Sequence, residues 1–223
     1  MKPIKIIVTG ASGRMGQTII KKILINKSLK LIGATEGSKN KFLGSDISEL
    51  IKSKKTGIII TDKIEPLFAK ADAVIDFTIP IATLNHAKMA AKYKIVHVIG
   101  TTGFSPSDEK KIGLAAKKAT IIKSGNMSMG INILQQVINK TASLFNDSFN
   151  IEILETHHKN KIDAPSGTAL MLGDSIANGR NQKLDKLKVI SKVGNRKKTK
   201  KSKITFNSFR RGNVVGDHKI IFS

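Results

Sequence analysis

Residues 4–16 read Ile-Lys-Ile-Ile-Val-Thr-Gly-Ala-Ser-Gly-Arg-Met-Gly. The apolar start of this segment predicts a short strand, and apolar residues at helical spacing from Ile19 to Leu24 predict that a helix follows. The glycines between them allow a tight turn, a close approach of backbone to a pyrophosphate, and close packing of helix on strand. Their spacing is Gly-x-x-Gly-x-x-Gly, which differs from the common Gly-x-Gly-x-x-Gly. The segment nevertheless predicts a dinucleotide-binding turn.

An acidic residue follows at the distance that such a turn requires. The second apolar segment, residues 29–34, leads to Glu36, about 20 residues beyond the glycine turn. A carboxylate at this place can accept hydrogen bonds from the ribose of an adenosine. The alternative is a glutamate that only ends a strand.

Strands and helices then alternate along the first half of the chain. Further strands are expected at 57–61, 73–77, 96–100 and 120–123, and helices at 64–69, 81–92 and 107–118. This alternation is typical of an α/β fold with a doubly wound parallel sheet.

The expected carboxyl ends of three of these strands carry small and polar residues. They read Asp-Phe-Thr-Ile-Pro at 76–80, Gly-Thr-Thr-Gly-Phe at 100–104, and Ser-Gly-Asn-Met at 124–127. Ligands of parallel α/β sheets bind at this edge, where hydroxyl and amide groups can orient a nicotinamide or a ribose. Each segment alone would be ordinary turn chemistry, but three at one edge predict a site.

After residue 127 the pattern changes to a smaller α+β unit with a mixed open sheet. An amphipathic helix is expected over 129–145 and a second helix over 166–178. Strands are expected around 151–154 and near 187–191, 203–209 and 214–222. We therefore expect a dinucleotide-binding domain over 1–127 and a substrate-binding and oligomerisation domain over 128–223.

The most reactive segment, residues 151–170, lies in this second unit. An apolar strand leads into His157 and His158, Lys161 follows in a short loop, and Ser166 is a good N-cap for the next helix. Titratable imidazoles, a cation and a helix N-terminus suit a small acid that is protonated during reaction. The alternatives are solvated loop histidines and a metal site formed by His157, His158 and Asp163.

Composition excludes several classes of protein. The formal charge of +23 raises the hypothesis of nucleic-acid binding, but the lysines are spread along the chain and concentrate only at 195–203. Aromatic residues make up only 4%, too few for a base-stacking platform. There is no apolar run long enough for a membrane span and no leader pattern, and the absence of cysteine suits a cytoplasmic protein.

The chain resembles the 4-hydroxy-tetrahydrodipicolinate reductase family, also called dihydrodipicolinate reductases, of diaminopimelate and lysine biosynthesis. The matching segments are residues 10–16, 76–78, 100–103, 126–132 and, most specifically, Glu-Thr-His-His-Lys-Asn-Lys-Ile-Asp-Ala-Pro-Ser-Gly-Thr-Ala at 155–169. The resemblance implies a Rossmann-like first domain, a small dicarboxylate substrate, NADH or NADPH as cofactor, and a homotetramer.

The resemblance also implies roles for individual residues. His157 would protonate the carbon next to the one that receives the hydride, Lys161 would assist, and His158, Gly167 and Thr168 would bind the substrate carboxylates. The residues implied for the cofactor are Gly10, Ala11, Ser12, Gly13, Arg14 and Met15 at the pyrophosphate, Glu36 at the ribose, and Gly100, Thr101, Thr102, Ser124, Gly125, Asn126 and Met127 at the nicotinamide.

Two features depart from the family pattern. Gly37 stands where relatives that use NADPH often carry arginine, so we predict that NADH is used at least as readily, with Lys39 or Lys41 as substitutes for the arginine. Relatives also continue beyond the position of Ser223, so we expect exposed sheet edge and an impaired product. The remaining alternatives are a catalytically dead remnant, another nicotinamide-dependent oxidoreductase, and a basic protein that binds nucleic acid.

Overall fold

The computed structural model describes residues 2–145, 148–191 and 202–223, which form two compact units. The units comprise Met1–Ser124 and Gly125–Ser223, a division close to the domain boundary expected near residue 127. Most of the basic segment 195–203 lies outside the described residues. Within the described ranges, no helix has both the length and the apolar character needed to cross a membrane.

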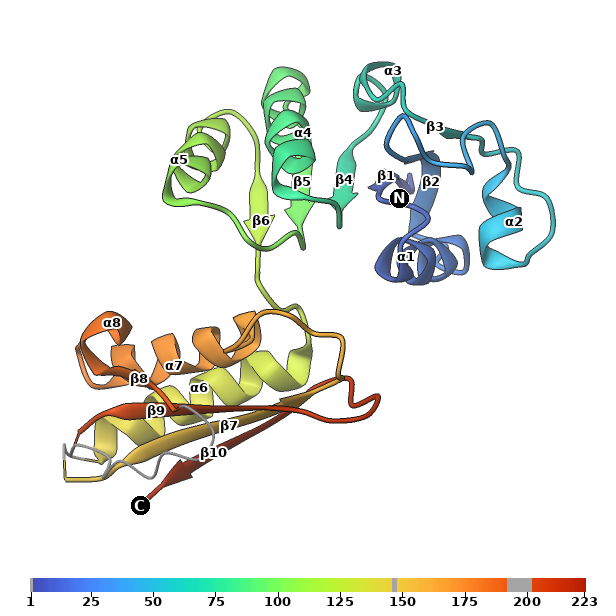
Figure 1. The fold of residues 1–223 in the computed structure, drawn as a ribbon. Coiled ribbons are helices and arrows are strands. Elements are labelled where there is room, and N and C mark those ends of the chain that lie inside the picture. Colours follow the sequence, from blue (N-terminus) through green and yellow to red (C-terminus); the bar gives the residue numbers. More distant parts are fainter. Residues whose placement is uncertain (1, 146–147, 192–201) are drawn as a thin grey trace. The chain divides into compact units, whose positions relative to one another are not determined.

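The first unit is built on a parallel sheet of six strands in the order β3-β2-β1-β4-β5-β6 (Figure 1). This order is typical of dinucleotide-binding sheets and confirms the predicted α/β fold. The strands are β1 (Ile4–Thr9), β2 (Leu29–Thr35), β3 (Ile60–Thr61), β4 (Ala73–Asp76), β5 (Val96–Ile99) and β6 (Ile121–Lys123). The helices are α1 (Arg14–Leu24), α2 (Ile47–Ile51), α3 (Glu65–Phe68), α4 (Pro80–Tyr93) and α5 (Pro106–Ala115).

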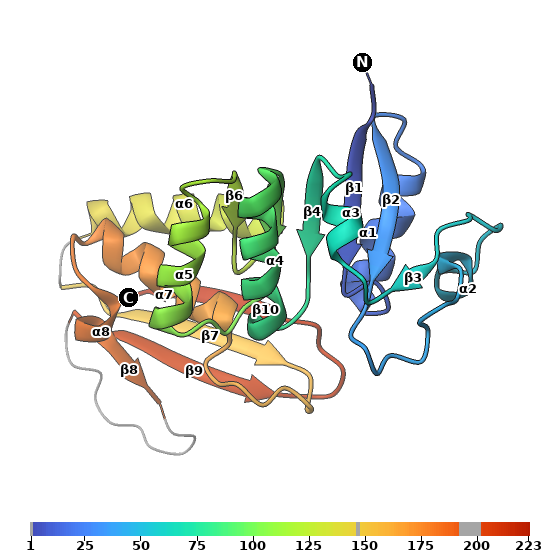
Figure 2. The ribbon, with the colours of Figure 1, turned by 90° about the horizontal axis from the view of Figure 1, so that it is seen from above.

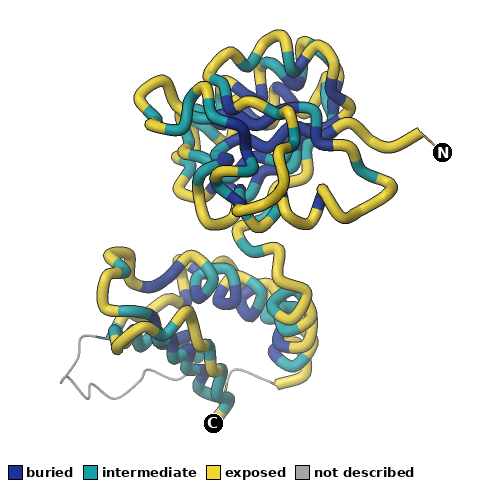
Figure 3. Tube along the Cα trace, turned by 90° about the vertical axis from the view of Figure 1, so that its right-hand side faces the viewer, coloured by how far each residue is buried: buried dark blue, intermediate teal, exposed yellow. Residues whose placement is uncertain are grey.

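The core of this unit lies on both faces of the sheet, because successive side chains of a strand point to opposite sides. Ile6 and Val8 of β1 pack with Ile20 of α1 in one cluster, whereas Ile7 packs with Phe68 in another. Figure 3 shows the corresponding buried segments at the centre of the unit. Burial of an isoleucine or phenylalanine side chain contributes about 1.5–3 kcal/mol, so these clusters fix the sheet that carries the glycine turn.

The sequence-based prediction was wrong in part at residues 57–61. Only Ile60–Thr61 form a strand, and Ile59 makes an isolated bridge with Asp46. Asp46 caps α2 through Ser48 N and also accepts hydrogen bonds from Thr56 and Gly57 N. These side-chain contacts bind the backbone of the preceding segment and so compete with strand pairing.

The second unit combines two long helices with a mixed sheet in the order β10-β7-β9-β8. β10 runs antiparallel to β7, while β7, β9 and β8 run parallel, so the expected mixed open sheet is confirmed. Figure 2 shows β8 beside β9 at one edge. The elements are α6 (Met129–Leu144), β7 (Ile151–His157), α7 (Gly167–Gly179), α8 (Leu184–Leu187), β8 (Lys188–Ile190), β9 (Ile204–Arg210) and β10 (Asp217–Phe222).

Helices α6 and α7 cover one face of this sheet (Figure 1). Ile151 and Ile153 of β7 are fully buried against Leu172 of α7 and Phe206 of β9. Burial alternates along β7, so every second residue from Ile151 to His157 points to the covered face. The polar side chains of Glu155 and His157 therefore continue the same row as the core isoleucines.

Candidate functional site

The glycine turn after β1 has the close packing that its sequence predicts. Gly10 has φ +74°, and a Cβ there would lie 2.6 Å from the carbonyl oxygen of Phe77. A Cβ at Gly16 would lie 2.1 Å from the carbonyl oxygen of Gly10, so α1 sits directly on the turn. The N-cap of α1, Gly13, has no capping side chain, which leaves the first turn of α1 suited to an anion.

Glu36 at the end of β2 is bound to this turn. Its Oε1 accepts hydrogen bonds from the backbone N–H and from the hydroxyl of Ser12, both at 2.7 Å. The amide of Asn40 donates to the same hydroxyl at 2.9 Å. Glu36 Oε2 accepts a longer bond of 3.3 Å from Gly37 N. The carboxylate thus holds the turn through Oε1, and Oε2 can accept a further hydrogen bond.

A cleft of about 630 Å³ lies beside the turn and Glu36. Of the sequence-predicted cofactor residues, Gly10, Ser12, Gly13 and Glu36 line it, whereas Ala11, Arg14, Met15 and residues 100–102 do not. Asn85 and His86 of α4 also line it, and sequence reasoning missed both. The other lining residues are Thr35, Gly37, Ser38, Asp62, Ile64, Phe77, Thr78, Ile79 and Ala82.

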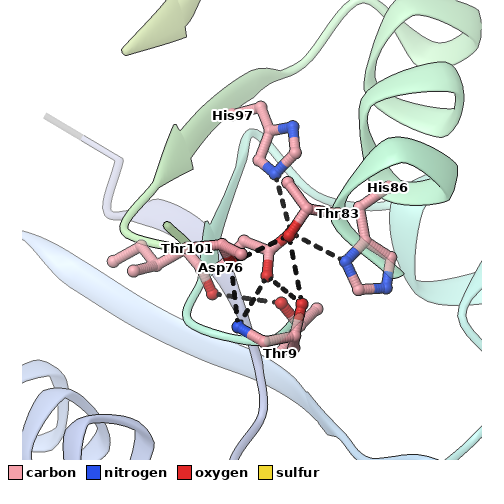
Figure 4. A network of polar contacts seen from close by, with 8 residues as sticks. Thr9, Asp76, Thr83, His86, His97 and Thr101 are labelled. Atoms are coloured by element: carbon pink, nitrogen blue, oxygen red, sulfur yellow. Dashed lines mark hydrogen bonds and ion pairs between the residues drawn. The ribbon is translucent and has the colours of Figure 1, made fainter. Parts of the chain in front are cut away.

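A buried carboxylate, Asp76, lies at the end of β4 beside this cleft (Figure 4). Its Oδ2 is 2.8 Å from Nδ1 of His86 and 3.1 Å from Nε2 of His97. Its Oδ1 accepts from the hydroxyl of Thr78 at 2.6 Å and from Thr78 N at 3.1 Å. Burial raises the pKa of the Asp76 carboxyl, but the hydrogen bonds of the two histidines and Thr78 outweigh it and hold the pKa below its usual range.

Three threonines extend this network to the next strand. Thr78 N donates to the hydroxyl of Thr101 at 3.1 Å, and the hydroxyl of Thr83 donates to the same atom at 2.8 Å. Gly100, which precedes Thr101, has no room for a side chain, since a Cβ there would lie 2.2 Å from the ring of Phe77. Gly100 and Thr101 therefore lock the carboxyl ends of β4 and β5 together, while Thr102 is exposed.

In the second unit, His157 ends β7 with its imidazole in direct contact with Glu155. The atoms involved are His157 Nδ1 and Glu155 Oε2, and both side chains are buried. The other oxygen of Glu155 accepts from Nη1 of Arg210 at 3.1 Å. Burial raises the pKa of Glu155, but Ser208, Arg210 and His157 lower it more, so the carboxylate is favoured.

A third imidazole, that of His218 on β10, completes this cluster. Its ring meets the ring of His157 edge-on at a centroid distance of 5.2 Å, and its Nε2 is 3.3 Å from the hydroxyl of Ser166. Burial, followed by the nearby His157, lowers the pKa of His218. A Cβ at Gly216 would lie 2.8 Å from Nε2 of His157, so Gly216 packs closely beside that nitrogen and a larger residue would press on it.

The loop after β7 carries the remaining predicted cation. Nζ of Lys161 pairs with Asp163 at 2.8 Å, and this contact lowers the pKa of the Asp163 carboxyl. Arg210 holds the same loop, because its Nε donates to the carbonyl of Lys161 at 3.1 Å and its Nη2 to the carbonyl of Asp163. His158 follows the strand and is partly buried.

The start of α7 gathers residues predicted for both ligands. The hydroxyl of Ser166 accepts from Ala169 N at 3.1 Å, which confirms the expected N-cap. Gly167 is exposed with open space around its Cα. Thr168 accepts from the amide of Asn126 at 3.1 Å, so a predicted cofactor residue touches a predicted substrate residue. Gly125 lies near Met171 and Met127 is exposed, whereas Ser124 belongs to the first unit.

A metal site has a candidate in the described residues, but its electrostatics are unfavourable. Donor atoms of Glu155, His157 and His218 lie within 4.8 Å of one another. This set differs from the predicted His157, His158 and Asp163. The Arg210 guanidinium already occupies one oxygen of Glu155, and His157 is in direct contact with the other. An ion would have to displace the imidazole from the carboxylate and bind beside a fixed cation.

Comparison with known proteins gives one consistent result. A family model described as dihydrodipicolinate reductase, N-terminus, matches residues 4–127, and one described as dihydrodipicolinate reductase, C-terminus, matches residues 130–223. The 4-hydroxy-tetrahydrodipicolinate reductase of Parvibaculum lavamentivorans is 46% identical over 221 residues, covering 99% of this chain and 82% of the relative. That of Brucella abortus is 48% identical over 219 residues, covering 98% and 82%.

Solved structures agree with the sequence relatives. A dipicolinate-bound dihydrodipicolinate reductase from Paenisporosarcina sp. TG-14 is 26% identical, with a TM-score of 0.69, and covers 99% of this chain and 83% of that one. Aspartate semialdehyde dehydrogenase from Candida albicans, at 14% identity and a TM-score of 0.59, shares the fold alone.

Proposed function

The chain belongs to the dihydrodipicolinate reductase family, and on this premise we propose that it reduces 4-hydroxy-tetrahydrodipicolinate to tetrahydrodipicolinate with NADH or NADPH. One observation carries the proposal furthest. A buried imidazole backed by a carboxylate, a loop lysine and an open helix N-terminus occur together in the second unit. This set can protonate a reacting carbon and bind carboxylates.

The first unit is proposed to bind the cofactor. The glycine turn and the first turn of α1, residues 10–15, would hold the pyrophosphate, and Glu36 would accept from the ribose through Oε2. Residues 100–102 and 124–127 would line the nicotinamide side. A bound nicotinamide cofactor supplies the hydride. The 630 Å³ cleft beside Glu36 supports the placement of the pyrophosphate and the ribose at the glycine turn and Glu36.

The chemistry of the cofactor phosphate bears on the choice between NADH and NADPH. Gly37 offers no side chain next to Glu36, and nothing lies within 4 Å of a Cβ built there. Lys41 lies over the ring of Phe42, 5.1 Å from its centroid, and Lys39 is exposed. Because position 37, next to Glu36, is glycine and carries no guanidinium, we propose that NADH is used at least as readily as NADPH.

His157 is proposed to be the general acid. Because Nδ1 faces Glu155, the nitrogen left for a substrate is Nε2, which lies beside Gly216. Glu155 stabilises the imidazolium before the proton is given up. Proton donation by a placed side chain contributes about 10²- to 10⁴-fold in rate.

Lys161, His158, Gly167 and Thr168 are proposed to bind the substrate. The dianion would meet two backbone N–H groups at the start of α7 and the Thr168 hydroxyl, all near the Ser166 cap. Lys161 would exchange Asp163 for a substrate carboxylate, since that ion pair lies in an exposed loop and such pairs contribute only about 0–1 kcal/mol. A small dicarboxylate is also the ligand of the Paenisporosarcina structure.

The family also leads us to expect a homotetramer. Apolar side chains are exposed at Val189, Ile190 and Phe209 of the second sheet, and a second copy could cover them. Light scattering on the purified chain measures its mass, and a monomer at assay concentration would contradict this expectation.

Oxidation of NADH and NADPH, followed with substrate generated in situ, tests the proposed reaction. We compare the parent with His157→Ala, Lys161→Ala and the control Lys159→Ala, which changes an exposed lysine in the same loop. Activity in the parent and control that is lost in both site variants supports the proposal. An inactive parent that binds NADH, or full activity in His157→Ala, contradicts it.

A further inference from the structure

Arg210 is the last residue of β9 and contacts two separate parts of the candidate site. Strand pairing places it opposite His157 of β7. Its Nη1 donates a hydrogen bond to Glu155 Oε1. Its Nε and Nη2 donate to the carbonyls of Lys161 and Asp163, respectively. Nη1 also donates to the carbonyl of Phe209 at 2.7 Å. One side chain therefore connects the neighbour of the proton donor with the loop that carries Lys161.

We propose that Arg210 and Glu155 are positioning residues, which together set His157 and the Lys161 loop in the arrangement needed for proton transfer. This inference rests on the proposed function. Neither residue touches the reacting atoms: Arg210 acts through Glu155 and two backbone carbonyls, and Glu155 acts through His157.

Burial is the first reason why Glu155 needs a cationic partner. The residue is 1% exposed, and a carboxylate so buried needs a charged or hydrogen-bonded partner. Arg210 pairs with Oε1 and His157 with Oε2. The guanidinium carries a permanent charge, so Glu155 stays ionised when His157 gives up its proton.

The carboxylate in turn orients the imidazole. A carboxylate at Nδ1 keeps the proton on that nitrogen and presents Nε2 outward, as the carboxylate partners of other functional histidines do. The charged or titratable groups around this pair are Arg210 on β9, His218 and Asp217 on β10, and Lys161 in the loop.

The geometry requires arginine and not merely a positive charge. The guanidinium binds acceptors in two segments. Nη1 donates to Glu155 of β7, whereas Nε and Nη2 donate to the loop carbonyls. Its five N–H donors have a fixed planar arrangement, so it can make these contacts at the same time. A lysine ammonium is a single point donor on a flexible stem. It can neutralise Glu155 or bind the loop carbonyls, but it cannot hold both.

The experiment compares Arg210→Lys, Glu155→Gln and the double variant with the parent. Arg211→Lys is the matched control, since Arg211 is an exposed neighbour. We expect kcat to fall about 100-fold in each single variant, because a small misplacement of a reacting group costs about that much, with KM within about threefold. Residues that act as one unit are not additive, so the double variant should lose little more than either single variant.

The pH profile separates positioning from a general structural role. Glu155→Gln removes the charge that stabilises the imidazolium, so the fall of kcat on the basic side should move to lower pH. Arg210→Lys keeps that charge and should lower kcat without this movement. Equal profiles in the two variants, or kcat of Arg210→Lys within threefold of the parent, would overturn the inference.

A second measurement does not depend on turnover. Nitrogen-15 spectra of the histidine rings report which ring nitrogen carries the proton, and we expect Nδ1 of His157 in the parent and a mixture of tautomers in Glu155→Gln. An unchanged tautomer overturns the inference even if a variant is too unstable to assay. An inactive parent with the expected tautomer would instead point to failure of the proposed function.

Discussion

Ser12 donates two hydrogen bonds to the same oxygen of Glu36, one from its backbone and one from its hydroxyl, each 2.7 Å long. These two contacts join the glycine turn to the end of β2. A hydrogen bond to a charged group contributes about 1.5–3 kcal/mol, so this contact is strong enough to preset the shape of the turn.

Glu36→Gln should weaken NADH binding about tenfold or more. The substitution removes the carboxylate that accepts hydrogen bonds from the turn and that we propose accepts from the ribose. Titration of NADH fluorescence measures the Kd. Glu49→Gln on α2, an exposed residue, is the control and should bind as the parent does. Equal affinity in all three proteins would show that Glu36 does not contact the nucleotide.

Gly37→Arg should shift the cofactor preference towards NADPH. There is open space around position 37, so a guanidinium can reach the 2′-phosphate without displacing other groups. We expect the ratio of kcat/KM for NADPH to that for NADH to rise about tenfold, the value of one added charged contact. Gly37→Gln, which has length but no charge, should leave the ratio near that of the parent. A parent with a strong NADPH preference would contradict our reading of Gly37.

Gly216→Ala should lower kcat about 100-fold by pressing on Nε2 of His157, the nitrogen that we propose donates the proton. The added methyl would lie 2.8 Å from Nε2, so either the ring or β10 must move. Gly113→Ala in α5 has open space and should instead add about 0.5–1 kcal/mol of stability without loss of activity. Full activity of Gly216→Ala would show that Nε2 is not the reacting nitrogen.

Asp76→Asn should destabilise the first unit by about 3–5 kcal/mol, since it leaves two buried histidines without their anion. The folded pKa of Asp76 is lowered, so its stabilising contribution is present above the unfolded pKa of about 4 and is lost as pH falls below it. The free energy of unfolding of the parent, measured with urea, should therefore fall more steeply below pH ~4 than that of Asp76→Asn. Asp185→Asn, in an exposed ion pair, is the control and should change stability by less than about 1 kcal/mol.

Local patterns were sufficient to predict the order of strands and helices and the parallel sheet. The apolar run 4–8 and the glycine turn specify a strand and a following helix without reference to distant residues. The helices α2 and α8, of five and four residues, were not predicted, whereas α3, which is equally short, was expected at 64–69. The segment 57–59 looked like strand but is held as loop by the Asp46 side chain.

In the second unit, the candidate site was predicted only where its residues are neighbours in sequence. The histidines, the lysine and the Ser166 cap occur within ten residues of one another. Arg210 and His218 reach Glu155 and His157 through the pairing of β9 and β10 with β7, and register between distant strands has no local signature. Likewise, nothing in the sequence links Asp76 to His97, 21 residues away on the adjacent strand.

The alternation of side chains along β7 places core residues and candidate site residues on the same face of the strand. Ile151 and Ile153 must face the helices, and the same two-residue period then points Glu155 and His157 to that side. An insertion of one residue within the strand would turn the isoleucines to water and the acid away from its partner at once. Any change that preserves the buried apolar face of this strand therefore also preserves the direction of the side chain that we propose as the proton donor.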